Sequence, residues 1–126
     1  MNSETTIAPM IAVVDDDESL GRSLARFLSA SGFRPVIYQS AETFLADTPR
    51  PEFDCLIVDL QLDGISGTDL RKRLISAGLN IPTILMTARY RTEIDETALQ
   101  TVGAVFLHKS TPGKVLLATI QRLMHP

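Results

Sequence analysis

The sequence predicts an α/β fold, in which five parallel strands alternate with five helices in a doubly wound sheet. Two observations support this prediction. Short apolar runs are separated by segments whose apolar residues recur at helical spacing. Four of these runs stop at polar residues, namely Asp15, Asp59, Thr87 and Lys109. Apolar runs bounded by turn residues indicate buried strands, and their alternation with helices favours a parallel sheet covered on both faces.

The strands are expected where apolar residues cluster between turn residues. They cover residues 10–14, 35–38, 55–58, 83–86 and 104–108. The second begins with Pro35, and proline is tolerated at the first position of a strand. The third contains the single cysteine, Cys55, which we expect to pack in the core.

The helices are expected from apolar faces and from residues that start or stop helices. They cover residues 19–31, 41–47, 66–78 and 92–103, and a last helix runs from 111 almost to the C-terminus. The first has an apolar face at helical spacing, formed by Leu20, Leu24, Phe27 and Leu28. Ser40 can cap the second, and capping boxes open the third (66–69) and the fourth (92–95). Pro112 is expected at the first helical position of the last helix. The fourth helix has the weakest apolar face.

Length and composition limit the possible classes of protein. With 126 residues, of which 44% are hydrophobic, the chain suits one globular domain. We expect a flexible arm over residues 1–9 and the domain over residues 10–126. The formal charge of −3 indicates neither a nucleic-acid surface nor a polybasic membrane patch. One cysteine allows no internal disulfide, and no apolar stretch is long enough to span a membrane, so a cytoplasmic protein is expected.

The polar residues at the strand ends indicate where a site would form. If the strands are parallel neighbours, their carboxyl ends share one edge of the sheet. That edge would hold several carboxylates from Asp15, Asp16 and Asp59, a hydroxyl from Thr87 and an ammonium from Lys109. Open α/β sheets bind ligands at this edge.

These residues, in this order and on these elements, resemble a response-regulator receiver domain. The resemblance rests on an acidic pair after the first strand, an aspartate after the third, Thr-Ala after the fourth and lysine after the fifth. It extends from about Met10 to Leu123. The segments at 15–20 and 65–67 are similar to those of nitrogen-fixation and nodulation regulators. The resemblance implies a flavodoxin-like sheet with strand order 2-1-3-4-5.

The resemblance also implies a role for each residue of the site. Asp59 would be the phosphoryl acceptor, and Thr87 and Lys109 would contact the phosphoryl group. Mg²⁺ (or Mn²⁺) would be held by Asp15, Asp16, Asp59 and the backbone carbonyl of Gln61. Phe106 would be the switch aromatic, and we expect it to be substantially inward before phosphorylation.

The proposed metal has a physical reason. Two carboxylates about 5 Å apart repel by roughly 3 kcal/mol at an effective dielectric constant of about 20. A hard divalent cation with oxygen ligands would reverse the local field and neutralise charge on a transferred phosphoryl group.

Two positions depart from the family pattern. Ser110 follows the lysine where the family usually has proline, often joined by a cis bond. We therefore expect a trans peptide between Lys109 and Ser110, since a cis bond before a non-proline residue costs about 2.5–4 kcal/mol. Asp63 also replaces a usual proline, which adds a carboxylate beside the site and removes a rigid turn.

The leading hypothesis is a phosphorylation switch in a two-component phosphorelay. A sensor histidine kinase or phosphotransfer protein would supply the phosphoryl group, and the chain would catalyse only its own phosphorylation and dephosphorylation. The fourth helix, fifth strand and fifth helix would form the switched surface, through which a homodimer could form, with no direct contact to nucleic acid or membrane.

A receiver-like interaction module that works without phosphorylation is the alternative, suggested by Asp63 and Ser110. A phosphohydrolase is disfavoured because Gln61 stands where such enzymes place a general acid.

Overall fold

The computed structural model describes residues 7–88 and 104–125. In this part of the chain, five parallel strands form one sheet in the order β2-β1-β3-β4-β5. The strands are β1 (Met10–Val14), β2 (Arg34–Tyr38), β3 (Cys55–Asp59), β4 (Thr83–Thr87) and β5 (Val105–His108). The helices are α1 (Glu18–Ala30), α2 (Ala41–Ala46), α3 (Gly67–Ser76) and α5 (Gly113–Met124). The predicted fold class and strand order are confirmed.

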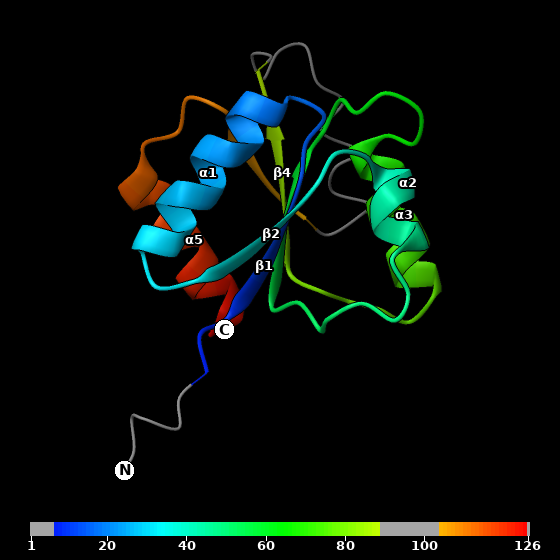
Figure 1. The fold of residues 1–126 in the computed structure, drawn as a ribbon, viewed down its shortest axis with the longest axis horizontal. Coiled ribbons are helices and arrows are strands. Elements are labelled where there is room, and N and C mark those ends of the chain that lie inside the picture. The colour runs from blue at the N-terminus through cyan, green and yellow to red at the C-terminus, as the bar shows by residue number, and fades with distance from the viewer. Residues whose placement is uncertain (1–6, 89–103, 126) are drawn as a thin grey trace.

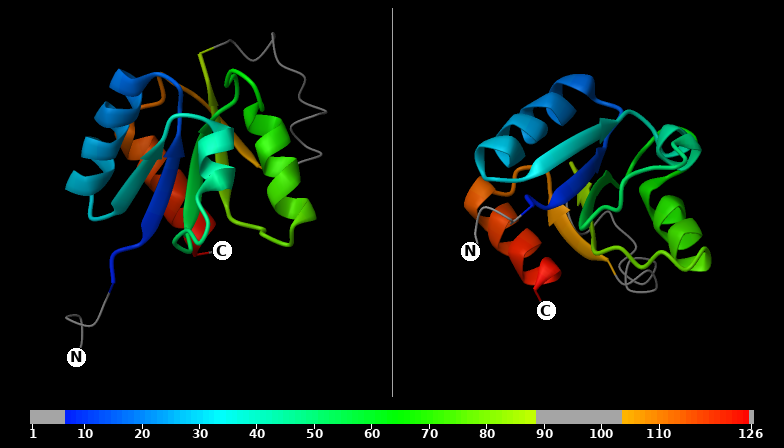
Figure 2. Two further views of the ribbon diagram at one scale, coloured as in Figure 1. Left: turned by 45° about the vertical axis from the view of Figure 1, so that its right-hand side comes forward. Right: turned by 60° about the horizontal axis from the view of Figure 1, so that its bottom comes forward.

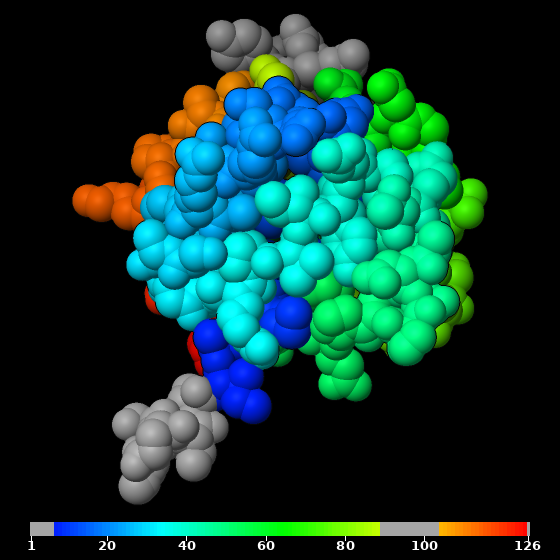
Figure 3. All heavy atoms as spheres, in the orientation of Figure 1, coloured from blue at the N-terminus to red at the C-terminus, as the bar shows by residue number. Residues whose placement is uncertain are grey.

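The helices form two layers, one on each face of the sheet. Helices α1 and α5 cover one face, and α2 and α3 cover the other (Figure 1). Two rotated views show the same three-layer arrangement (Figure 2). In the space-filling view, α1, the edge strand β2 and α2 lie next to one another on the near face (Figure 3). This arrangement leaves the carboxyl ends of the central strands at one end of the molecule.

The continuous apolar runs are explained by this double coverage. Successive side chains of a strand point to opposite faces, so both faces of a central strand must be apolar when helices cover both. In β1, Ile11 and Val13 pack in the core beneath α1 and α5, whereas Ala12 and Val14 pack in the core beneath α2 and α3. Cys55 is fully buried in the first of these cores, as predicted, and burial raises its pKa to about 12.

Each predicted helix that falls on described residues is present, and its ends lie within one or two residues of the predicted ones. Ser40 and Ser66 cap α2 and α3 by accepting hydrogen bonds from the N–H groups of Thr43 and Asp69. Helix α1 begins earlier than predicted, because the Asp17 side chain accepts the N–H of Leu20 and makes Asp17 the N-cap. Pro112 was expected as the first helical residue of α5 and is instead its N-cap. Its ψ of 147° is extended, so helical geometry starts only at Gly113.

Two predictions fall wholly or partly outside the described residues. The predicted fourth helix, 92–103, lies there entirely. Of the predicted arm, only residues 7–9 are described, and there the carbonyls of Ala8 and Pro9 accept hydrogen bonds from Arg34. No helix in the described part of the chain is long and apolar enough to cross a membrane.

Candidate functional site

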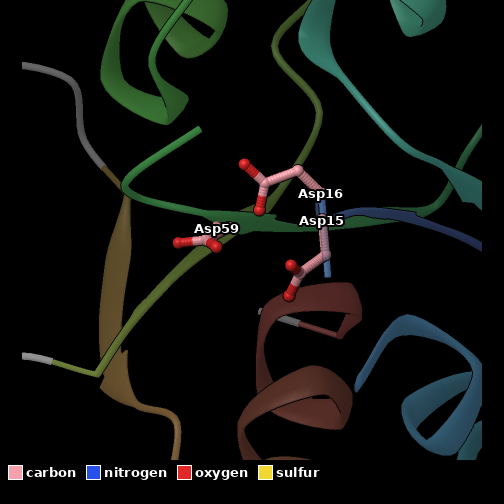
Figure 4. A group of neighbouring side chains, drawn as sticks. All are labelled: Asp15, Asp16 and Asp59. Carbon is pink, nitrogen blue, oxygen red and sulfur yellow. The ribbon is translucent and has the colours of Figure 1, made fainter. Parts of the chain in front are cut away.

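Three aspartates converge at the carboxyl ends of the neighbouring strands β1 and β3. Asp59 is the last residue of β3, and Asp15 and Asp16 follow β1, which pairs with β3 in parallel register. One carboxylate oxygen from each lies within 4.8 Å of the other two (Figure 4). Asp15 and Asp59 are only 6% and 7% exposed, whereas Asp16 is exposed. The sheet therefore brings together the acidic residues that the sequence predicted to meet.

Lys109 places a positive charge against the two buried carboxylates. Its Nζ donates to Asp59 Oδ2 at 2.9 Å and lies 3.6 Å from Asp15 Oδ2. The backbone of Lys109 is anchored separately, because its N–H donates to the carbonyl of Thr87 at 2.7 Å. The lysine thus reaches from the end of β5 to the end of β3.

The pKa shifts show that the site is electrostatically strained. Burial raises the pKa of Asp15, and the nearby charges of Asp59 and Asp16 add to this increase. The hydrogen bond from Asp17 and the charge of Lys109 oppose the shift without reversing it. Burial alone would lower the pKa of Lys109, but its hydrogen bond to Asp59 and the charges of both aspartates raise it overall. The positive charge of Lys109 therefore does not offset the combined effect of burial and carboxylate repulsion on the pKa of Asp15.

The Asp59 carboxylate is oriented by its own loop as well as by Lys109. Its Oδ1 accepts the backbone N–H of Gln61 at 2.9 Å, while Oδ2 accepts from the lysine. The loop then returns so closely that a Cβ on Gly67 would overlap the Asp59 backbone oxygen. Glycine is required at that position because the start of α3 packs directly on the backbone of the aspartate.

Two carboxylates outside this loop hold its middle part. The N–H of Asp63 points to Asp16 Oδ2 at 3.4 Å, and the N–H of Ile65 donates to Glu42 Oε2 at 3.1 Å. The proline usual at position 63 could not make the first of these contacts, because proline has no N–H. Glu42 was not singled out from the sequence. No local signal could reveal it, since the contact joins α2 to a loop 23 residues later.

Two further predicted site residues, Thr87 and Phe106, lie in β4 and β5. Thr87 is fully buried at the last position of β4, and Phe106 is half-buried in β5 against the core beneath α2 and α3. Among the described residues only the Thr48–Pro49 bond is cis, so the bond between Lys109 and Ser110 is trans, as predicted. Lys109 nevertheless contacts Asp59, which shows that the trans bond is compatible with a completed site.

The donor set fits a hard divalent cation. Three carboxylates supply oxygen ligands, and Mg²⁺ prefers a few such ligands with water or phosphate completing its coordination. An added cation would also offset the burial and the carboxylate repulsion that together raise the pKa of Asp15.

The fold and the site together define a class of protein. A parallel sheet of order 2-1-3-4-5, with an aspartate cluster and a lysine at its carboxyl edge, is a doubly wound α/β domain with its site where such sheets bind ligands. Residues 11–121 match the family model of the response regulator receiver domain. The chain therefore belongs to the response regulator receiver domain family.

Known relatives agree with this assignment. The chain is 32% identical over 112 residues to the transcriptional regulatory protein FixJ of Rhizobium meliloti (strain 1021), covering 89% of this chain and 55% of that protein. It is 34% identical over 115 residues to the sensory transduction protein RegX3 of Mycobacterium tuberculosis (strain H37Rv), covering 90% and 50% respectively. The crystal structure of FixJ-N superposes with a TM-score of 0.82 at 30% identity, covering 96% of this chain and 98% of that one. The chain spans about half the length of the curated relatives it matches.

Proposed function

We propose that this receiver domain accepts a phosphoryl group on Asp59 and acts as a phosphorylation switch. The carrying observation is the contact of Lys109 Nζ with Asp59 Oδ2 at 2.9 Å, beside the carboxylates of Asp15 and Asp16. A nucleophilic carboxylate must be ionised, and a lysine held against it favours the ionised form. The same lysine would neutralise charge on an incoming phosphoryl group.

Each residue of the site has a separate role in phosphoryl transfer. A carboxylate oxygen of Asp59 forms the new P–O bond, while the donor's bond to phosphorus breaks and its electron pair leaves with the donor. Lys109 supplies positive charge, and Thr87 offers a hydroxyl donor. Mg²⁺, held by Asp15, Asp16, Asp59 and the carbonyl of Gln61, would neutralise phosphoryl oxygens when bound. The chain would then catalyse only its own phosphorylation and dephosphorylation.

The phosphoryl donor and the output belong to the same proposal. A phosphohistidine on a sensor kinase or phosphotransfer protein would be the source, in the cytoplasm. The surface formed by the predicted fourth helix, β5 and α5 would carry the response, including any homodimer, with Thr87 and Phe106 as switch residues.

The test is phosphoryl uptake from a small donor such as acetyl phosphate with Mg²⁺. Intact-mass measurement soon after mixing should show one added phosphoryl group on the wild type and none on Asp59→Asn. Asp63→Asn is the matched control, since it removes an exposed carboxylate from the same loop, and it should be labelled like the wild type. Labelling of Asp59→Asn at the wild-type level would refute the acceptor assignment. A wild type that is never labelled would favour the alternative, an interaction module that works without phosphorylation.

A further inference from the structure

His108 connects the end of β4, which carries Thr87, to the end of β5, which Lys109 follows. It is the last residue of β5 and lies opposite Thr87 in the β4–β5 register. Its Nδ1 accepts the backbone N–H of Ser110 at 3.0 Å, and the Ser110 Oγ lies 2.7 Å from the same nitrogen. Its Nε2 lies 3.0 Å from the carbonyl oxygen of Ala88. One ring therefore contacts the residue after Thr87 and the residue after Lys109.

These contacts select one form of the ring. A backbone N–H can only donate, so Nδ1 must present its lone pair to Ser110. A carbonyl oxygen can only accept, so Nε2 must carry the hydrogen toward Ala88. Both conditions are met by the neutral ring protonated on Nε2, and the Ser110 hydroxyl can donate to Nδ1 as well.

Ser110 is the position where the family pattern usually has proline. Proline has no N–H and could not donate to Nδ1, so this arrangement depends on the departure from the pattern. We call the contacts of the His108 ring with Ala88 and Ser110 the clamp. Lys109 lies in the chain between His108 and Ser110. Its own N–H is held by the Thr87 carbonyl, and the next residue is held by His108. The backbone on both sides of the lysine Cα is thereby restrained.

We propose that His108 is a positioning residue, whose Nδ1 holds Ser110 so that Lys109 reaches Asp59 without the usual lysine–proline bond. The inference deepens the proposed function and rests on it for the role of Lys109. His108 does not touch the carboxylates in the contacts above, so it acts through the lysine and leaves the aspartate cluster intact. Its loss should slow phosphoryl uptake without weakening Mg²⁺ binding.

Matched variants distinguish the two hydrogen bonds of the ring, that of Nδ1 with Ser110 and that of Nε2 with Ala88. In His108→Asn, the side-chain oxygen can take the place of Nδ1 and accept from Ser110. In His108→Gln, the amide nitrogen can take the place of Nε2 and donate to Ala88, but no acceptor remains beside Ser110. His108→Leu removes both hydrogen bonds, and His125→Gln, in the exposed C-terminal residues, controls for loss of a histidine.

The kinetic experiment measures the initial rate of phosphoryl uptake from acetyl phosphate at saturating Mg²⁺, with the Mg²⁺ affinity measured separately. We expect His108→Leu and His108→Gln to be slower by about tenfold to a hundredfold, the cost of misplacing a catalytic group by about 1 Å. His108→Asn should recover most of the rate, and all variants should keep the wild-type Mg²⁺ affinity. Wild-type rates for both His108→Leu and His108→Gln, or a rate for His108→Asn no better than that of His108→Leu, would overturn the proposal.

Two measurements test the inference without phosphorylation. Nitrogen NMR of the wild type should show His108 as the neutral ring protonated on Nε2, and a ring protonated on Nδ1 would refute the clamp. In a double-mutant cycle, Lys109→Met should change the unfolding equilibrium less in the His108→Leu background than in the wild type. Equal changes in both would show that His108 does not position the lysine. If the wild type takes up no phosphoryl group, the proposed function fails, while these two results still decide whether the clamp exists.

Discussion

At the residue scale, Asp15 is the carboxyl group of the site whose ionised form is disfavoured by burial and by neighbouring carboxylates when no cation is bound. It is almost fully buried, and within the described residues the ammonium of Lys109 is the positive charge that lies against it. The sign of its effect on stability follows from its raised pKa. A carboxyl whose pKa is higher in the folded than in the unfolded protein stabilises the fold while protonated. That contribution is lost as the pH rises through the folded-state pKa.

We therefore predict that Asp15→Asn stabilises the metal-free protein at neutral pH. Asparagine never ionises. The variant therefore avoids the loss of folding free energy that the wild type undergoes when the buried Asp15 carboxyl ionises. The melting temperature in EDTA at pH 7 should rise by about 2–5 °C, the effect of roughly 1 kcal/mol or less in a domain of this size. The difference in melting temperature between the variant and the wild type should shrink as the pH is lowered toward 3.8, the ordinary pKa of an aspartate.

Asp63→Asn provides the control at the same scale. It removes an exposed carboxylate near Asp16 while keeping the backbone N–H that points to it. Its effect should be small, since exposed charges are screened by solvent. A destabilised Asp15→Asn in EDTA at pH 7 would show that the lost attraction to Lys109 outweighs the relief from burial and repulsion.

At the scale of elements, the connection from β3 to α3 is packed without spare room. Helix α3 starts against the backbone of the last β3 residue, and a Cβ on Gly67 would also lie 3.0 Å from the Leu60 Cα. The obstructing atoms belong to the backbone, so no side-chain rotation can relieve the clash. Any side chain at this position must move either the helix or the Asp59 loop.

We predict that Gly67→Ala destabilises the domain by about 1–3 kcal/mol, as expected for overpacking a close contact. It should also slow phosphoryl uptake, because the displaced loop carries Asp59 and Gln61. Urea unfolding and the uptake assay measure the two effects.

Gly21→Ala is the matched control within α1. Among the described residues, a Cβ there would meet the Ile37 side chain at an ordinary 3.5 Å. Because alanine is favoured over glycine in a helix interior by up to about 1 kcal/mol, this variant should be neutral or slightly more stable. Equal stability of the two variants would contradict the close packing described for Gly67.

At the scale of the whole molecule, cation binding and folding should be linked. The aspartates come from separate strands, so the cluster exists only when the sheet is assembled. A ligand that binds only the folded state stabilises it by RT ln(1 + [L]/Kd), about 2.7 kcal/mol at one hundred times Kd.

We predict that Mg²⁺ raises the melting temperature of the wild type in a saturable manner. The rise should be much smaller in Asp16→Ala, whose exposed carboxylate is one of the three candidate ligands. Thermal unfolding across a Mg²⁺ titration at constant ionic strength separates specific binding from screening. An equal rise in both proteins would remove Asp16 from the site.

Much of the architecture was predictable from local patterns. Apolar runs such as 55–58 identify strands buried on both faces, and a parallel sheet places their following residues on one edge. Asp15, Asp59 and Lys109 could thus be placed together from sequence alone. Pro112 was predicted as the first helical residue of α5, because proline is common at that position, but its extended ψ makes it the N-cap.

Contacts between elements that are distant in the chain were decided only by the tertiary structure. Arg71 in α3 is 4% exposed and donates to the Ile81 carbonyl, although arginine in a helix is ordinarily expected at the surface. Glu42 holds the loop at Ile65, and His108 joins Ala88 to Ser110. Apolar periodicity reports which face of an element is buried, but not which polar atoms lie opposite it. Those partners depend on the relative placement of helices and loops, which arises only when the sheet and both helical layers have packed.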